Sequence, residues 1–296
     1  MNSYCFEGHV LPEPSAFTTD NVHAASEALV EFVQRHPRLW VITGAGVSTD
    51  SGIPDYRDAA GQWKRPPPVQ HADFMGSHSV RQRYWARALV GFKALSDAKV
   101  GGAHQALAQL EALGHVEQVV TQNVDRLHQR AGSRRVVDLH GRADLVVCMQ
   151  CDYRMMRHAL HAEMAHLNPA FAALDAGHAP DGDADLETDF NTFQVHDCPR
   201  CGGIFKPDVV FYGDVVPALR REQAQAALDR ADAVLAVGTS LMVFSGYRFF
   251  RHAHARKLPL AALNLGVTRA DPLLSLKLNA PLTPVLEATV KCLQST

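Results

Sequence analysis

Residues 41–57 read Val-Ile-Thr-Gly-Ala-Gly-Val-Ser-Thr-Asp-Ser-Gly-Ile-Pro-Asp-Tyr-Arg. The apolar run 39–42 predicts a buried strand, and a glycine pair, Gly44 and Gly46, follows it at once. Glycines there can take positive φ and let a phosphate approach the backbone. The third glycine of a G-x-G-x-x-G fingerprint is not at its place, and the polar stretch 48–58 predicts a loop. Alone, this segment fits either a dinucleotide site or a plain strand-to-loop turn.

Strands and helices alternate outward from this segment. The expected strands are 39–42, 116–121, 136–139, 233–237 and 260–264, the last parallel strand, and the expected helices are 20–36, 79–97, 103–113, 217–230 and 246–256. This alternation predicts an α/β fold with a doubly wound, Rossmann-like parallel sheet. We expect residues 25–145 and 207–296 to form this domain, residues 146–206 to form a small inserted module, and residues 1–24 to form an N-terminal arm.

Composition limits the partners. The chain has 296 residues, 47% of them apolar and 20% charged, and a net charge of −2. This balance gives no reason to expect binding to nucleic acid or an anionic membrane. Since no apolar run reaches ~18 residues, and the N-terminus lacks a basic start followed by an apolar stretch, we expect no membrane span and no export. The expected compartment is the cytoplasm, and the expected oligomeric state is a monomer.

Four of the six cysteines form two Cys-x-x-Cys pairs. In a reducing compartment such pairs indicate metal binding before disulfides. Cys148, Cys151, Cys198 and Cys201 therefore predict one tetrahedral zinc, with free thiols as the alternative. Four thiolates leave no open coordination position, so this zinc should be structural.

Four expected strands end in polar or glycine-rich segments, namely 44–46, 122–125, 238–240 and 264–266. Ligands of open α/β sheets bind beyond the carboxyl ends of the strands. Any one of these segments fits simple helix capping. Four together favour a dinucleotide crevice.

His140 is the candidate catalytic residue among 16 histidines, because it stands at the end of the expected strand 136–139 and before Gly141. An imidazole titrates near neutral pH and can therefore act as a general base. The alternative is an ordinary surface or capping histidine.

Five segments in order resemble the sirtuins, the NAD-dependent protein lysine deacylases. They are the segment 44–58, Thr121-Gln-Asn-Val-Asp-Arg-Leu-His128, Leu139-His-Gly141, the two cysteine pairs and Gly238-Thr-Ser-Leu241. The resemblance covers roughly residues 25–290 and is strongest to the class II branch. It implies that the lysine acyl group passes to ADP-ribose with release of nicotinamide. His140 would then act as the base, and Asn123 would position the ribose and the attacking water.

The resemblance also implies the remaining site residues. The cofactor-binding set is Gly44, Ala45, Gly46, Ser48, Asp55, Tyr56, Arg57, Gln122, Asn123, Asp125, Gly238, Thr239, Ser240, Asn264, Leu265, Gly266 and Leu282. Val209, Val210 and Phe211 would pair with the substrate backbone, opposite Ser245. A buried core strand is the alternative for the two valines.

Tyr84 and Arg87 lie three residues apart on an expected helix, so both side chains can share one face. Their spacing matches the Tyr-x-x-Arg pair with which the desuccinylase branch holds an acidic acyl group. An amphipathic surface helix is the alternative.

The sequence does not identify the acyl-lysine protein substrate. The alternative functions are an NAD-binding regulatory module and a protein mono-ADP-ribosyltransferase.

Overall fold

The computed structural model describes residues 19–295 except 57, 59, 65–67, 176–183 and 185. Its strands are β1 Leu39–Thr43, β2 Val116–Thr121, β3 Val136–Asp138, β4 Gly141–Cys148, β5 Arg154–Met156, β6 Phe205–Val209, β7 Ala233–Val237, β8 Leu260–Leu263 and β9 Leu276–Leu278. Its α-helices are α1 Thr19–Arg35, α2 His71–Gly76, α3 His78–Asp97, α4 Gly102–Ala112, α5 Leu127–Arg130, α6 Arg157–Leu167, α7 Pro169–Ala172, α8 Ala218–Arg230, α9 Phe244–Ala255 and α10 Leu282–Gln294. Short 3₁₀ helices span Ala45–Ser51, Phe190–Thr192 and Asp271–Leu273.

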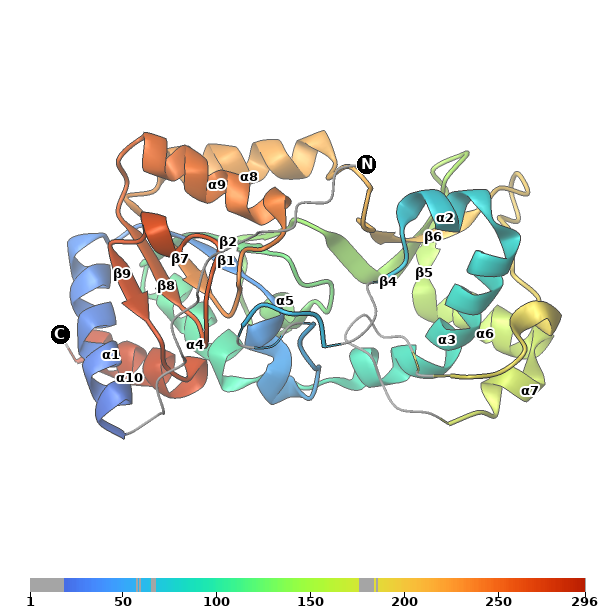
Figure 1. Cartoon of the computed structure of the whole chain (residues 1–296), viewed down its shortest axis with the longest axis horizontal. Coiled ribbons are helices and arrows are strands. Elements are labelled where there is room, and N and C mark those ends of the chain that lie inside the picture. The colour runs from blue at the N-terminus through green and yellow to red at the C-terminus, as the bar shows by residue number, and fades with distance from the viewer. Residues whose placement is uncertain are drawn as a thin grey trace.

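A six-stranded parallel sheet forms the larger part of the molecule, with strand order β3-β2-β1-β7-β8-β9. Strands β1, β7 and β8 are buried along their whole length, because helices cover both faces of the sheet. One face packs against α1, α4 and α10, and the other packs against α8 and α9 (Figure 1). The predicted doubly wound sheet is therefore confirmed.

The expectation that residues 260–264 hold the last parallel strand is wrong. Strand β9 pairs in parallel with β8, so the segment 260–264 does not hold the last parallel strand. Strand β9 is only three residues long, has two partly exposed positions and carries Lys277 at its centre. Such a strand shows too little alternation to be recognised from sequence. Helix α10, which follows it, also lies outside the predicted elements.

A second, antiparallel sheet has the order β5-β4-β6 and carries the cysteine pairs near its ends. Helices α2, α3 and α6 lie beside this sheet at one end of the molecule (Figure 1). Their apolar side chains form one core with it, in which Phe74 and Trp85 accompany Val146 and Phe205. Helices α2 and α3 precede residue 146 in the chain, so the module recruits part of the segment assigned to the larger domain. The domain boundaries themselves stay a prediction.

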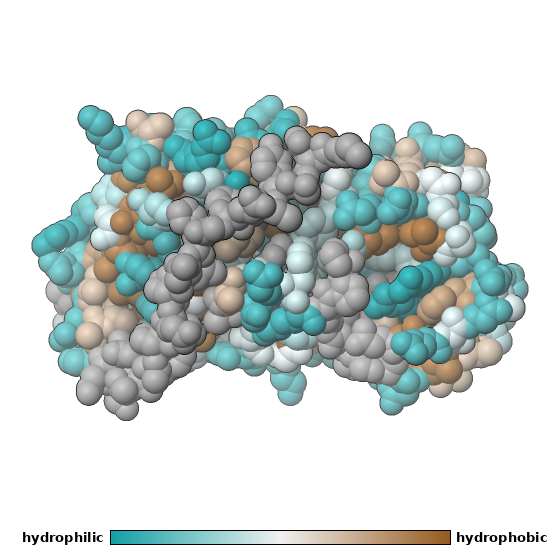
Figure 2. All heavy atoms as spheres, in the orientation of Figure 1, coloured by the Kyte–Doolittle hydropathy of each residue, from teal (hydrophilic) through white to brown (hydrophobic). Residues whose placement is uncertain are grey.

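Helices on the visible face mostly present hydrophilic side chains, and hydrophobic ones show in the furrows between them (Figure 2). Within the described ranges, no helix is both long enough and apolar enough to cross a membrane.

Candidate active site

A cavity of about 750 Å³ lies at the carboxyl ends of the central parallel strands, in the range typical of small-molecule sites. Loops after β1, β2, β7 and β8 line one side of it, and the end of β6 with part of α3 lines another. Most of the predicted residues border it: Gly44, Ala45, Gly46, Ser48, Asp55, Tyr56, Tyr84, Gln122, Asn123, Asp125, His140, Val209, Val210, Phe211, Gly238, Thr239, Ser240, Ser245, Asn264 and Leu265. Arg87, Gly266 and Leu282 do not border it, and Arg57 lies outside the described residues.

The glycine pair after β1 is needed for close packing. The sequence suggested that Gly44 and Gly46 take positive φ. Gly44 has φ −138°, however, and Gly46 does not have positive φ either. A Cβ on Gly46 would lie 2.9 Å from the Cα of Gly238, whose carbonyl accepts a hydrogen bond from the Gly46 amide at 2.9 Å. The loops after β1 and β7 therefore touch backbone to backbone, where the strand order reverses. The chain then enters the 3₁₀ helix Ala45–Ser51 in place of the predicted loop.

Asn123 and Asp125 tie the loop after β2 to the loop after β1. The Asn123 amide donates to the Gly44 carbonyl and to the Ser48 hydroxyl, both at 3.0 Å. Ser48 in turn donates to Asp125 at 2.7 Å. These bonds hold three predicted cofactor-binding side chains in fixed positions at the cavity wall.

Gln122 connects the neighbouring strands. Its amide donates to the Thr43 carbonyl at 3.2 Å and to the Thr239 hydroxyl at 2.8 Å. The polar ends of β1, β2 and β7 are therefore one hydrogen-bonded unit, and helix capping alone does not describe them.

His140 lies between β3 and β4 with both ring nitrogens engaged. Nδ1 lies 3.1 Å from the Gln122 carbonyl oxygen, which can only accept, so Nδ1 donates. Nε2 is then the basic nitrogen, and it accepts from the Ser245 hydroxyl at 2.7 Å. The pKa of His140 is lowered to about 4, chiefly by burial and to a smaller extent by nearby Arg220, while the Gln122 hydrogen bond acts in the opposite direction. The imidazole is therefore neutral at pH 7. The lone pair of Nε2 points at the hydroxyl of Ser245, a residue that borders the cavity.

The segment 209–211 runs along the cavity but is only partly a strand. β6 ends at Val209, which pairs with Gly141, and the Val210 amide donates to the His140 carbonyl at 2.8 Å. The Phe211 ring packs against Tyr84, with ring centroids 5.4 Å apart. Ser245 lies in the first turn of α9, contacts His140 and also borders the cavity.

The residues after β8 form the far end of the predicted cofactor site. The Asn264 amide donates to the Leu265 carbonyl at 2.9 Å, and the Gly266 amide donates to Asn279 at 2.9 Å. Leu282 packs beside Gly238, because a Cβ on that glycine would lie 2.8 Å from a Leu282 methyl carbon. Leu282 therefore lies behind the glycine turn, next to the cavity lining.

Asp55 and Tyr56 belong to the segment that borders the cavity after the 3₁₀ helix. Asp55 forms an ion pair with Lys64, and Tyr56 makes an edge-to-face contact with Trp63. Trp63 in turn contacts Tyr212, next to Phe211. This aromatic chain links the Asp55 segment to the small sheet.

Tyr84 and Arg87 separate in the structure. Tyr84 is buried between Phe74 and Phe211 and borders the cavity. Arg87 is half-buried, and its Nε donates to the Ala184 carbonyl at 2.7 Å. Their helix, α3, is therefore partly buried, but only the tyrosine of the pair faces the candidate acyl pocket.

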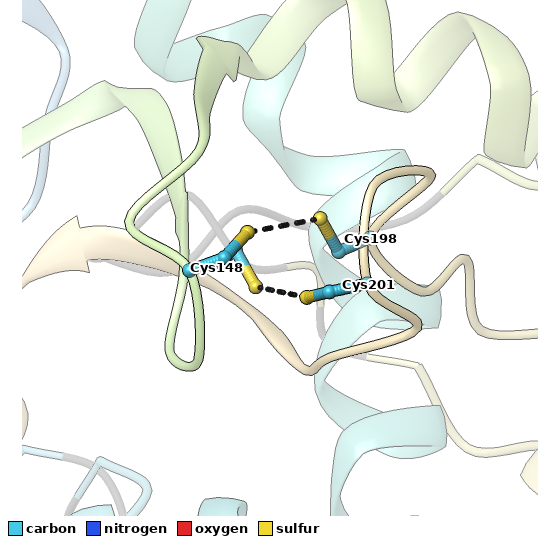
Figure 3. Close-up of side chains that lie close together, drawn as sticks. Cys148, Cys198 and Cys201 are labelled. Carbon is cyan, nitrogen blue, oxygen red and sulfur yellow. Dashed lines mark hydrogen bonds between the residues drawn. The ribbon is translucent and has the colours of Figure 1, made fainter.

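The four predicted zinc ligands come together. All four Sγ atoms lie within 4.8 Å of one another, with Cys148 3.5 Å from Cys201 and Cys151 3.7 Å from Cys198 (Figure 3). Sulfurs around a tetrahedral zinc, with Zn–S bonds of about 2.3 Å, are about 3.8 Å apart. The donor set and its spacing therefore suit one structural zinc ion.

The two cysteine loops repeat one backbone design. The amide of each first cysteine donates to the carbonyl five residues on, Tyr153 or Gly203, at 2.8 Å in both loops. Each second cysteine is followed by a left-handed residue, Asp152 with φ 56° or Gly202 with φ 70°. Each loop is therefore shaped by its own hydrogen bonds into a hook that presents two sulfurs.

Arg157 borders the cavity and was not predicted from sequence. It opens α6, within the inserted segment 146–206, for which no helix was predicted. Its cavity position depends on packing against α3, about sixty residues earlier, so no local sequence signal marks it.

Comparison with known proteins identifies the family of the chain. Residues 44–245, more than half of the chain, match the model of the Sir2 family. A protein of Bordetella bronchiseptica named NAD-dependent protein deacetylase is 57% identical over 265 residues, which cover 89% of this chain and 97% of that protein. The Drosophila melanogaster NAD-dependent protein deacylase Sirt4 is 44% identical, over 85% of this chain and 82% of its own.

Solved structures agree as well. A structure described as Sir2 with a p53 peptide and NAD+ superimposes with a TM-score of 0.71 at 27% identity, covering 91% of this chain and 99% of that one. With the parallel sheet, the glycine turn, His140 and the four-cysteine cluster all in place, the chain belongs to the Sir2 family and is a sirtuin.

Proposed function

We propose that this sirtuin is an NAD-dependent protein lysine deacylase, which moves the acyl group from a lysine side chain to ADP-ribose and releases nicotinamide. The observation that carries the proposal is that a neutral His140 shares one cavity with the glycine turn at the reversal point of the sheet. The names of the relatives support it, since they describe NAD-dependent deacetylases and a deacylase.

The loops after β1, β7 and β8 would hold the dinucleotide. The backbone of Gly44–Gly46 and Gly238–Ser240 borders the cavity, and backbone amides in such a turn suit phosphates. Gln122, Asn123 and Asp125 suit the nicotinamide ribose, and Asn264 to Gly266 with Leu282 suit the adenosine end. When bound, NAD supplies a ribose carbon whose nicotinamide leaving group departs as the acyl oxygen bonds to it.

His140 would accept a proton at Nε2 from a ribose hydroxyl. Its Nδ1 hydrogen bond to Gln122 fixes the tautomer that leaves Nε2 basic, and also stabilises the positive charge that the proton brings. Ser245 occupies Nε2 in this state and must rotate its hydroxyl away, or pass its bond to the substrate, when the substrate arrives. Asn123, held by Gly44 and Ser48, would position the ribose and a water.

The peptide backbone around the acylated lysine would lie along residues 209–211, opposite Ser245. The zinc would hold the small sheet in shape. It would take no part in the reaction, because four thiolate ligands leave no open coordination position. We further propose that the protein acts in the cytoplasm, as a monomer, and has no nucleic-acid or membrane partner.

The decisive experiment measures nicotinamide release from NAD with and without an acylated lysine peptide. Deacylation predicts release only with the peptide, and equal amounts of nicotinamide, O-acyl-ADP-ribose and free lysine by mass spectrometry. Free acid as the primary product with NAD untouched would contradict the proposal. ADP-ribose attached to protein would indicate a mono-ADP-ribosyltransferase, and NAD binding without turnover would indicate a regulatory module.

A further inference from the structure

Arg157 is a buried guanidinium in the wall of the active-site cavity. The residue is only 1% exposed, yet it borders the cavity together with Leu95, Val124 and Tyr84. A buried charge normally has a carboxylate partner, because transfer of an unpaired ion out of water is costly. Within the described part of the chain, no Asp or Glu oxygen lies within 4.0 Å of this guanidinium.

The contacts of Arg157 leave part of its hydrogen-bonding capacity unused. Its guanidinium carbon lies 4.3 Å from the centre of the Phe92 ring and 5.6 Å from that of Trp85. Nη1 donates to the Ala143 carbonyl at 3.4 Å, a long bond. Nη2 is buried and, among the described residues, has no hydrogen-bond partner.

The remaining nitrogen, Nε, donates to His161 Nε2 at 3.2 Å. Burial and the neighbouring guanidinium lower the pKa of His161 to about 2, so the imidazole stays neutral and adds no compensating charge. Every group around the guanidinium is thus neutral, and one of its donors is unused.

Arg157 is connected directly to the proposed catalytic region. The Ala143 residue whose carbonyl it contacts donates its own amide to the Val124 carbonyl at 2.9 Å, and Val124 follows Asn123. Leu95, Val124 and Ala143 belong to one apolar cluster with Phe92. A chain entering from the Asn123 side would therefore pass an apolar wall before it meets the guanidinium.

We infer that Arg157 determines acyl specificity, and that it binds a carboxylate at the far end of the acyl chain on the substrate lysine. A carboxylate there would supply both the missing acceptor and the missing counter-charge, in a site from which water is excluded. The inference rests on the proposed deacylase function, and it assigns the charge-reading role to Arg157. Arg87, whose Nε donates to the Ala184 carbonyl, does not border the cavity and is therefore the control residue.

The test compares peptides that carry succinyl-, glutaryl- or adipoyl-lysine with peptides in which the terminal carboxylate is replaced by a carboxamide of the same shape. Binding is measured by fluorescence anisotropy without NAD, and nicotinamide release is measured with NAD. For the best-fitting length we expect the wild-type protein to bind the acid at least about tenfold more tightly than the amide, since charge-assisted bonds are roughly twice as strong as neutral ones. A ratio near one at every length would overturn the inference.

Arg157→Met should bring that ratio to about one and leave binding of the carboxamide peptide nearly unchanged, whereas Arg87→Met should keep the wild-type ratio. Arg157→Gln, which keeps a donor for the Ala143 carbonyl, serves the same purpose where the methionine variant does not fold. A folded Arg157 variant that keeps the acid preference, or an Arg87→Met variant that loses it, would contradict the inference. The binding ratio is measured without NAD and does not depend on turnover. Absence of peptide-dependent nicotinamide release would therefore refute only the deacylase proposal.

Discussion

At the scale of single residues, the site depends on side chains that are fixed before any ligand arrives. His140 has its tautomer set by one backbone carbonyl, and Asn123 is held by two acceptors. The sequence predicted both, because each follows the end of a strand in the parallel sheet. Arg157 escaped prediction, since its place in the cavity is created by the rings of Trp85 and Phe92 and not by its own neighbours in sequence.

Replacing the base tests the first of these residues. His140→Ala should lower the rate of nicotinamide-linked deacylation by roughly 10²–10⁴-fold, the usual contribution of a general base. The side chain is at a strand end and adds little to the core, so circular dichroism should be unchanged. A folded variant with a near-normal rate would remove His140 from the proposed mechanism.

Gly46 offers a second test at this scale, because it has a matched control. Gly46→Ala would place a Cβ 2.9 Å from the Cα of Gly238 and should destabilise the fold by about 1–3 kcal/mol while weakening NAD binding. Gly76→Ala, at the end of α2, meets nothing within 4 Å and should leave both unchanged. Urea unfolding and calorimetric titration with NAD measure the two effects, and equal behaviour of the two variants would argue against backbone contact as the reason for Gly46.

At the scale of elements, most of the long periodic segments were predictable and most of the short ones were not. Helices α1, α3 and α8 and the fully buried strands β1 and β7 begin and end within one or two residues of the predicted bounds. Strand β9 was missed because it has only three residues, two of them partly exposed. Helices α6 and α7, in the inserted segment, and the longer helix α10 were missed as well. The cysteine hooks, in contrast, were predicted because their spacing itself expresses the chemistry of the site.

The hooks lead to a prediction about metal. The purified protein should contain one zinc per chain, and Cys151→Ser or Cys201→Ser should lose it together with the packing of the small sheet, since binding of structural zinc is coupled to folding. Cys292→Ser, on α10 and outside the cluster, should keep the zinc. Elemental analysis and near-ultraviolet circular dichroism make the comparison, and fully active protein without zinc would contradict it.

At the scale of the whole molecule, four histidines are held neutral by burial. The pKa of His128 is lowered to about 3, that of His140 to about 4 and that of His161 to about 2, and the pKa of His104 is also lowered, in each case chiefly by burial. In the unfolded chain these groups titrate near the ordinary value of about 6.5. The unfolded state therefore binds more protons than the folded state below that pH.

The expected result is acid-labile folding. Stability contributed by the four imidazoles is present above about pH 6.5 and is lost as pH falls from there toward the folded pKa of each group, at about 1.4 kcal/mol per pH unit for each group kept neutral. The urea midpoint should decrease between pH 7 and pH 5. An unfolding free energy that stays constant over this interval would show that these histidines are protonated in the folded protein.

Strand β4 begins one residue after His140 and ends at Cys148, so the proposed general base and a proposed zinc ligand lie at opposite ends of one element. An eight-residue strand is about 25 Å long. The loops proposed to bind the dinucleotide, in contrast, are all carried by the larger sheet. Heat, chelator or oxidant that opens the cysteine hooks removes the anchor of β4 and leaves those loops in place. Inactivation should therefore proceed in a fixed order, with acyl transfer failing first while the protein still retains its affinity for NAD.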